Sequence, residues 1–337
     1  MPQTVVTLAM LNAIRDSAST AYVDSIPAAT RTNIAAIGTA LLTFPALLNE
    51  FTGTLVTKIA LTIFNQKIAI NRLAPFKSGL LPFGATVEEI FIEQVNSVVY
   101  DPTGANPLGR RKPTNVKVMY HTQNRQSTYE ISVSDAQIKS AFRSAAGVQS
   151  LVAGLIQSMY SGANDEEYIL MKNLLATYMD DATGLIPQYK DYEVAPITDT
   201  ATATDFVKAV RKAAQDMSFM SNQYNSAGVK TYCMPEDCVL LVNKDILVEI
   251  DTEVLAHAFN MDKTTMQGKI VSLDDFGSLP NTEGILMDKE FFKVYDTLNQ
   301  VESIRNPQGM FTTYYLQIWQ ILSLSRFKNA VRFVRQP

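Results

Sequence analysis

The chain has 337 residues and a formal net charge of −4, with 47% hydrophobic and 18% charged residues. This charge excludes a globally basic nucleic-acid-binding protein, because contacts from lysine and arginine to phosphate dominate binding to a duplex. Soluble domains carry about 25% charged residues, so the shortfall indicates that part of the surface meets other subunits.

The first fifty residues are predicted to form an arm with short helices. Apolar residues at 5–14 predict a few helical turns, and Thr32 or Asn33 can cap a second helix, which Pro45 kinks or ends. The most apolar stretch, residues 34–48, is too short to span a bilayer, which needs about 20 apolar residues. We therefore expect a soluble protein made in a reducing cytoplasm.

Residues 73–133 are predicted to form a long hairpin. Strand-like runs at 87–100 and 115–133 flank a link rich in glycine, proline and asparagine. A two-stranded ribbon alone is marginal in water, so we expect it to lie on another surface, such as a second subunit. The basic cluster at 110–112 fits a charged loop tip that pairs with a neighbour better than a phosphate site.

Residues 145–180 give the strongest helical pattern. Apolar residues from Val148 to Tyr160 recur at the spacing of one helix face, and a helix continuous to Met179 would be about 48 Å long. Another apolar helical stretch is plausible at 47–64.

Residues 196–290 are predicted to form a compact α/β unit, and residues 291–334 are predicted to return as strands. The expected elements are a helix capped by Thr204 or Asp205, a helix at 244–259, and strands at 239–242, 269–273, 284–287, 291–295, 301–305 and 310–324.

The two cysteines, Cys233 and Cys238, exclude the disulfide framework of small secreted domains. A zinc site with two cysteine and two histidine ligands would also need His121 and His257, which lack the close spacing of such ligands. We therefore expect two reduced, buried thiols and no metal site.

No catalytic or phosphate-binding motif is present. The sequence lacks G-x-x-x-x-G-K-[ST], G-x-G-x-x-G, H-E-x-x-H and G-x-S-x-G. Adjacent carboxylates such as Glu166–Glu167 and Asp274–Asp275 diverge from each other, which favours solvated pairs over acid/base dyads. The residues therefore argue against an enzyme, and we expect no cofactor.

Four stretches carry a resemblance to a known family. They are PFGATVEEI at Pro82–Ile90, NVKVMYHTQNRQSTY at Asn115–Tyr129, EIDTEVLAHAFNMDKT at Glu249–Thr264 and NPQGMFTTYYLQIWQILSLSRFKNAVRFV at Asn306–Val334. In these stretches the chain resembles the major capsid proteins of small short-tailed bacteriophages, the phi-29-like group of podoviruses or picoviruses.

The resemblance implies an α+β chain with the tailed-phage major capsid protein fold of the Hong-Kong-97 type. The expected parts are an N-terminal arm at 1–50, an extended hairpin loop at 73–130, an axial domain at 196–290, and a peripheral domain at 51–72, 131–195 and 291–337, whose spine helix occupies 145–180.

The resemblance also implies a function in assembly. Copies of the chain would form hexamers and pentamers of an icosahedral or prolate shell around double-stranded DNA. The expected partners are other copies, a scaffolding protein in trans, a portal protein and DNA in weak nonspecific contact, with no membrane. The protein would reside in the virion capsid after assembly in the host bacterial cytoplasm.

In such a shell the hairpin overlies the spine helix of a neighbour. We expect contacts between subunits from nine hairpin residues, namely Val87, Ile90, Phe91, Val116, Val118, Tyr120, Arg110, Arg111 and Lys112. Two alternatives stay open: an encapsulin-like nanocompartment shell with the same fold, and a soluble α/β enzyme, which is less favoured because no catalytic constellation supports it.

Overall fold

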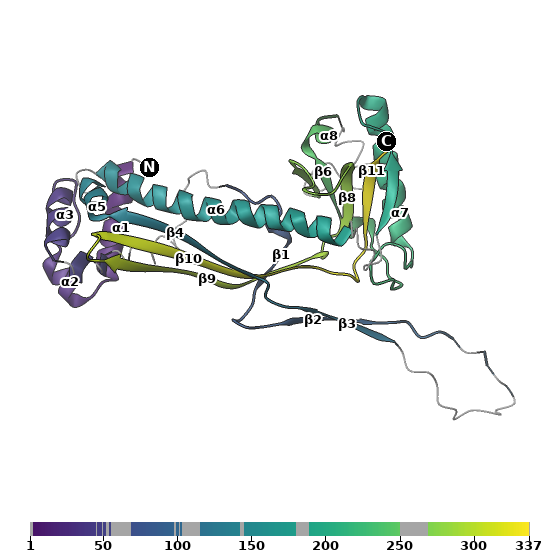
Figure 1. The fold of residues 1–337 in the computed structure, drawn as a ribbon, viewed down its shortest axis with the longest axis horizontal. Helices are drawn as coiled ribbons and strands as arrows, with labels where there is room; N and C mark the ends of the chain where they lie inside the picture. Colours follow the sequence, from purple (N-terminus) through teal and green to yellow (C-terminus); the bar gives the residue numbers. More distant parts are fainter. Residues whose placement is uncertain are drawn as a thin grey trace. The chain divides into compact units, whose positions relative to one another are not determined.

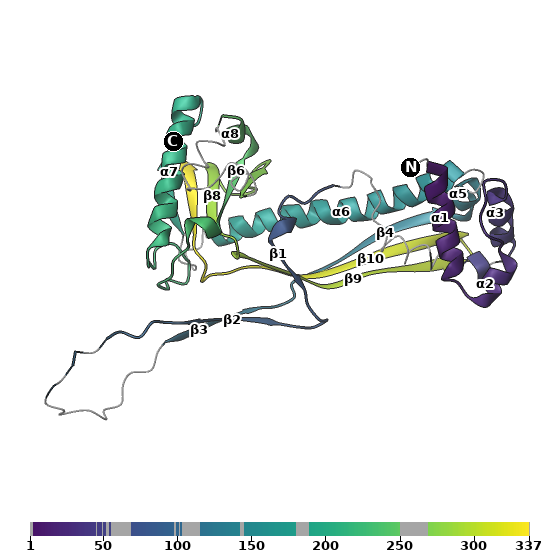
Figure 2. The same cartoon turned by 180° about the vertical axis from the view of Figure 1, so that it is seen from behind.

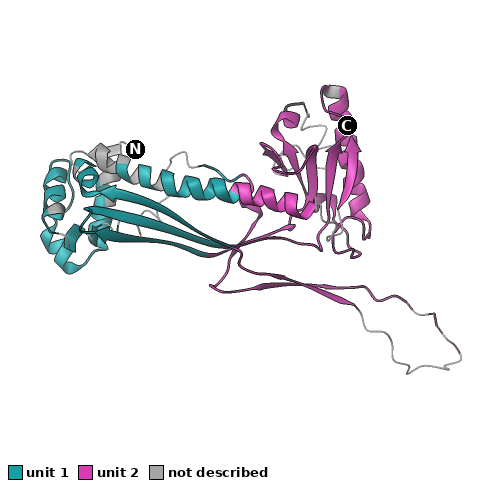
Figure 3. Cartoon of the chain, in the orientation of Figure 1, with its two compact units in different colours: residues 1–71, 125–167, 298–319 teal, residues 72–124, 168–297, 320–337 magenta. Residues whose placement is uncertain are grey.

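The computed structural model divides the chain into two compact units. Unit 1 contains residues 1–71, 125–167 and 298–319, and unit 2 contains residues 72–124, 168–297 and 320–337 (Figure 3). The structure describes residues 3–44, 46–48, 50–51, 54, 69–97, 99–100, 102, 115–141, 145–179, 189–249 and 269–336. Each unit is therefore assembled from segments that lie far apart in the sequence.

Short helices supply much of the apolar core of unit 1. They are α1 (Gln3–Asp16), α2 (Thr20–Ser25), α3 (Ile34–Thr43) and α5 (Asp135–Ala141). Side chains such as Ile14 and Leu41 are fully buried in one cluster with Tyr314. The helix α3 ends before Phe44, whose extended backbone is the conformation that a following proline favours.

A five-stranded sheet forms the centre of unit 2 (Figure 1). Its strand order is β5 (Lys190–Val194), β11 (Ala330–Arg335), β8 (Thr282–Asp288), β6 (Cys238–Asn243) and β7 (Ile270–Leu273). The strand β8 runs antiparallel to both of its neighbours, whereas the edge strands β5 and β7 run parallel to theirs. The sheet is therefore mixed.

Both faces of this sheet are covered by apolar side chains. The helix α7 (Thr200–Ser218) lies beside it in Figure 2, and the rings of Phe206 and Phe333 meet edge to face at 5.3 Å. On the other face, Leu241 shares a cluster with Met171 and Leu175 of α6 (Ala145–Met179). Successive strand residues point to opposite faces, which is why neighbours in β6 belong to different clusters.

The second large sheet has the strand order β1 (Lys77–Leu80), β9 (Phe292–Asn306), β10 (Phe311–Leu324) and β4 (Arg125–Ser134). Three further short helices are η1 (Ala74–Phe76), η2 (Pro235–Asp237) and α8 (Lys244–Glu249). Helices and sheets together give the predicted α+β class, and α6 confirms the long helix expected at 145–180.

Three expectations about the elements were wrong. The helix α7 begins earlier than expected, because Asp199 and Thr202 form a capping box ahead of Thr204. The strands expected at 291–295 and 301–305 are the single strand β9, whose polar middle includes Asp296, paired with Lys77 at 2.9 Å. The run expected at 115–133 is two strands, β3 (Val116–His121) and β4, which belong to different sheets.

Parts of two predicted helices lie outside the described residues. These parts are residues 49, 52–53 and 55–64 of the stretch expected at 47–64 and residues 250–259 of the helix expected at 244–259. No helix in the described part of the chain is long and apolar enough to cross a membrane.

Candidate functional site

The strands β2 (Val87–Ile92) and β3 form a two-stranded antiparallel ribbon in unit 2 (Figure 1). Within the described residues, each of these strands pairs only with the other. The register places Glu88 opposite Tyr120, Ile90 opposite Val118 and Ile92 opposite Val116. Because side chains alternate along a strand, these three pairs share one face, which we call the outer face.

The outer face of the ribbon is apolar and open to solvent. The exposed fractions of its five apolar or aromatic side chains lie between 42% and 63%; these residues are Ile90, Ile92, Val116, Val118 and Tyr120. The adjoining Val95, Val99 and Tyr100 are more exposed still. Soluble monomeric proteins rarely expose large contiguous apolar patches, so the outer face is a candidate docking surface.

The opposite, inner face of the ribbon is held by its own chain. The ring of Phe91 lies 5.8 Å from the ring of Phe327. The buried imidazole of His121 hydrogen-bonds through Nδ1 to Ser323 Oγ at 2.8 Å and through Nε2 to Glu89 Oε2 at 3.3 Å. The ribbon base therefore has a fixed register and a fixed face toward unit 2.

Glu89 is the electrostatic centre of this anchor. Burial opposes its ionisation, but hydrogen bonds from His121 and Ser325 and the nearby charge of Lys293 outweigh burial and lower the pKa of Glu89. Ser325 Oγ donates to Glu89 Oε1 at 2.8 Å, and Lys293 Nζ lies 3.7 Å from the same oxygen. The carboxylate is therefore held ionised against the base of the ribbon.

A small cleft adjoins the C-terminal end of β2. Lys117 Nζ donates to the carbonyl of Ala227 at 2.8 Å, and the cleft, about 230 Å³ in volume, lies between β2 and the segment that contains Gly228. Its lining is mostly polar and includes Glu93 and Lys230. Among the described residues, no group of three histidine, cysteine, aspartate or glutamate side chains can hold a metal ion.

The adjacent carboxylates have structural partners. Asp274 and Asp275 both accept from Lys172 Nζ, at 2.9 and 3.0 Å. In unit 1, Glu166 pairs with Arg125 at 3.0 Å, and Glu167 accepts from Asn71. These pairs position segments of the chain, and none forms an acid/base dyad.

The structure separates the predicted contact residues into three groups. Ile90, Val116, Val118 and Tyr120 lie on the outer face, whereas Val87 and Phe91 lie on the inner face. Arg110, Arg111 and Lys112 lie outside the described residues, as does His257. The predicted contact residues do not include Ile92. Because Ile92 is two residues after Ile90, it lies on the same face of any strand that contains both.

Both cysteines are buried, as the sequence predicts, and the structure contains no disulfide bond between them.

Comparisons with known proteins agree with one another. A family model described as Phi29-like phage major capsid protein matches residues 11–334. The major capsid protein of Bacillus phage B103 is 38% identical over 96% of this chain and 72% of its own length. That of Streptococcus phage Cp-1 is 28% identical over 95% of this chain and 92% of its own length.

Solved structures confirm the phage capsid fold. A chain in the capsid structure of Staphylococcus phage Andhra matches with a TM-score of 0.66 and 13% identity, covering 82% of this chain and 87% of the other. A chain of the mature capsid of bacteriophage PhiM1 matches with a TM-score of 0.52 and 10% identity, covering 82% and 91%. At these identities the likeness concerns the fold alone.

Proposed function

This chain belongs to the family of Phi29-like phage major capsid proteins, and on that premise we propose that the outer face of its ribbon is buried against a second copy during shell assembly. The protein is a structural head protein and not an enzyme, and it forms the capsid of the virion. The observation that supports the role of the ribbon is the pair of exposed apolar contacts, Ile90–Val118 and Ile92–Val116, above an anchored inner face.

The energetics favour a covered ribbon. Removing apolar surface from water contributes about 25 cal/mol per Å², so each such contact adds a modest stabilisation. A shell contains many copies, and every contact already made raises the effective concentration of the next. Many weak ribbon contacts therefore suffice to stabilise a closed shell, while a single copy stays soluble.

The proposed partner surface is α6 of the neighbouring copy. Ile169 on α6 is 45% exposed, although Met171 and Leu175 on the same helix are fully buried. This exposed isoleucine supplies a docking point for the apolar pairs of the ribbon. The phi-29-like resemblance, which implies a hairpin lying over a spine helix, points the same way.

The remaining features of the assembly belong to the same proposal. Copies form hexamers and pentamers that close into an icosahedral or prolate shell, with a scaffolding protein acting in trans and a portal protein at one vertex. Assembly takes place in the host bacterial cytoplasm. The net charge of −4 supports weak, nonspecific contact with the packaged double-stranded DNA. The domain boundaries given by the resemblance stay part of this prediction.

The test is a double substitution on the outer face, Ile90→Asp with Val118→Asp, in a chain expressed with its scaffolding protein. We expect shells to be lost in electron micrographs and light scattering, while far-ultraviolet circular dichroism of the soluble subunit stays unchanged. The matched control, Ile90→Val with Val118→Ile, keeps the apolar volume of the pair and should form normal shells. Normal shells from the aspartate variant would refute the proposal.

A further inference from the structure

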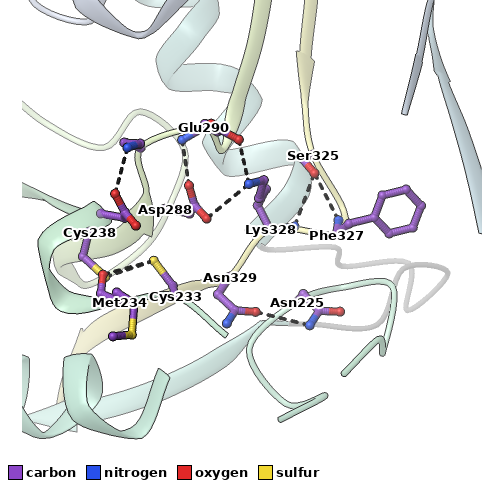
Figure 4. A network of polar contacts seen from close by, with 12 residues as sticks. Asn225, Cys233, Met234, Cys238, Asp288, Glu290, Ser325, Phe327, Lys328 and Asn329 are labelled. Atoms are coloured by element: carbon purple, nitrogen blue, oxygen red, sulfur yellow. Dashed lines mark hydrogen bonds and ion pairs between the residues drawn. The ribbon is translucent and has the colours of Figure 1, made fainter. Parts of the chain in front are cut away.

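Two thiols of unit 2 face each other in a buried corner of the molecule. Cys233 lies in the segment between α7 and β6, and Cys238 is the first residue of β6. Their Sγ atoms are 3.2 Å apart, and both sulfurs also lie near the carbonyl oxygen of Met234, at 3.6 and 3.4 Å (Figure 4). A disulfide bond is about 2.05 Å long, so the two sulfurs need to approach each other by only about 1 Å to reach bonding distance.

We propose that Cys233 and Cys238 are an oxidation site that closes to an intrachain disulfide once the virion has left the reducing host cytoplasm. The site takes a small disulfide or a comparable two-electron thiol oxidant. Only the timing rests on the family assignment, since the facing sulfurs are a property of the single chain.

The geometry keeps the pair reduced while the cell is intact. The hydrogen bond with Cys238 and burial both raise the pKa of the Cys233 thiol, so the nucleophilic thiolate is scarce. Cys233 and Cys238 are each at most 3% exposed. Oxidation therefore needs a brief local opening and proceeds slowly.

The segment around Cys233 is suited to such an opening. The side chains of Tyr232 and Met234, which flank Cys233, are both more than 40% exposed. Residues 232–234 belong to no helix or strand, and the Cys233 backbone N–H is tied to Met217 O at 2.8 Å at the end of α7. A small displacement of this segment brings Cys233 to the solvent without disturbing β6.

The reaction balances as two exchanges of thiol and disulfide. Cys233 loses its proton to solvent and attacks one sulfur of the oxidant, which breaks the oxidant's S–S bond, forms a mixed disulfide and releases one thiol. The Cys238 thiolate then attacks the Cys233 sulfur and displaces the second thiol. Cys233 and Cys238 together lose two electrons and two protons, and the small disulfide gains them as two thiols.

The bond would fasten the end of α7 to the sheet. Cys233 is linked through its backbone to Met217 of α7, and Cys238 pairs in register with Asp288 of β8. Closing this short loop lowers the entropy of the unfolded chain and so stabilises the fold. It also limits the local opening that would expose residues 232–234 to a protease.

The test uses the full chain, as soluble subunits and as assembled shells, incubated with oxidised glutathione. The protein is then denatured in excess iodoacetamide, and its peptides are analysed by mass spectrometry without reduction. We expect one intrachain link between Cys233 and Cys238, loss of both alkylation sites, and a higher melting temperature that dithiothreitol reverses.

The variants Cys238→Ala and Cys233→Ala identify the pathway. Cys238→Ala should stop at the mixed disulfide of Cys233 with glutathione, whereas Cys233→Ala should leave the buried Cys238 unmodified. Neither variant should show a rise in melting temperature. Recovery of two alkylated cysteines from the wild-type chain after prolonged oxidation would overturn the proposal. So would a product that contains only mixed or intermolecular disulfides. Because the wild-type experiment needs no substitution, a variant that fails to fold does not affect this outcome.

Discussion

The strand β8 and the β2–β3 ribbon are both rich in apolar residues, but only in β8 are all of these residues buried by other parts of the chain. Every residue of β8 is buried between β11 and β6, with Ile285 and Leu286 in apolar clusters on opposite faces. The ribbon buries its inner face and leaves the outer face open. We therefore expect folding and assembly to depend on different residues of the same chain, so that substitutions can separate the two.

The largest effect is expected in β8. Ile285→Asp places an unpaired charge in a fully buried site, so the free energy of unfolding should fall by about 4 kcal/mol or more, measured by urea denaturation of the soluble chain. Ile285→Val, which removes one methylene, should cost only about 1 kcal/mol. A folded aspartate variant with wild-type stability would contradict the role assigned to β8.

A smaller effect is expected where the two faces of the ribbon are compared directly. Phe91→Ala removes a half-buried ring that packs on Phe327, so the stability of the subunit should fall by about 1–2 kcal/mol in the same assay. Ile90→Ala, one position away on the outer face, should change it by less than about 0.5 kcal/mol. Equal losses from both would mean that the outer face is also packed within the subunit.

The Glu89 anchor should make the ribbon base sensitive to acid. The pKa of Glu89 in the folded chain lies below its ordinary value of 4.5. The contribution of Glu89 to the free energy of unfolding is therefore full above pH 4.5 and is lost as the pH falls through the lowered pKa. Glu89→Gln should cost about 1 kcal/mol at neutral pH, seen as a lower melting temperature. The difference in melting temperature between the variant and the wild type should disappear in acid. A difference that does not depend on pH would exclude the ionised carboxylate as its cause.

The smallest effect is expected at Asp274. Burial opposes its ionisation, but hydrogen bonds from Tyr168 and Lys172 lower the pKa of Asp274 to about 2, from an ordinary value of 3.8. Its contribution is therefore present above pH 3.8 and is lost between pH 3.8 and about 2. The carboxylate is half exposed, and Asp275 also pairs with Lys172, so Asp274→Asn should shift the urea midpoint only slightly. A large shift would show that Asp275 cannot substitute for it.

Regular patterns made several elements predictable from sequence. The spacing of apolar residues in α6 is sustained over many turns, so both its type and its bounds could be predicted. The boundary between β3 and β4 could not, because residues 122–124 contain neither glycine nor proline. Between the two strands, the side-chain amide of Asn124 donates a long-range hydrogen bond to Leu322 O at 2.8 Å. Such a bond has no signature in the local sequence.

Which residues share the outer face of the ribbon could be predicted only in part. Val116, Val118 and Tyr120 share a parity along the strand, and they do share the outer face. Val87 and Phe91 have the opposite parity to Ile90, so no strand can present all three on one face. Which of the two faces lies open depends on tertiary partners such as Phe327, and these are distant in the sequence.

The alternation of the ribbon also bears on how this gene can change. Consider the part of the ribbon between the His121–Glu89 anchor and the Ile92–Val116 pair. If one strand gains or loses a single residue there, every later side chain of that strand moves to the opposite face of the ribbon. A single-codon insertion there would therefore move inner-face residues such as Phe91 to the outer face and outer-face apolar residues to the inner face. Insertions of two codons would preserve the pattern. We therefore expect natural length variation in this part of the ribbon to occur in even steps, whereas individual apolar residues exchange freely among themselves.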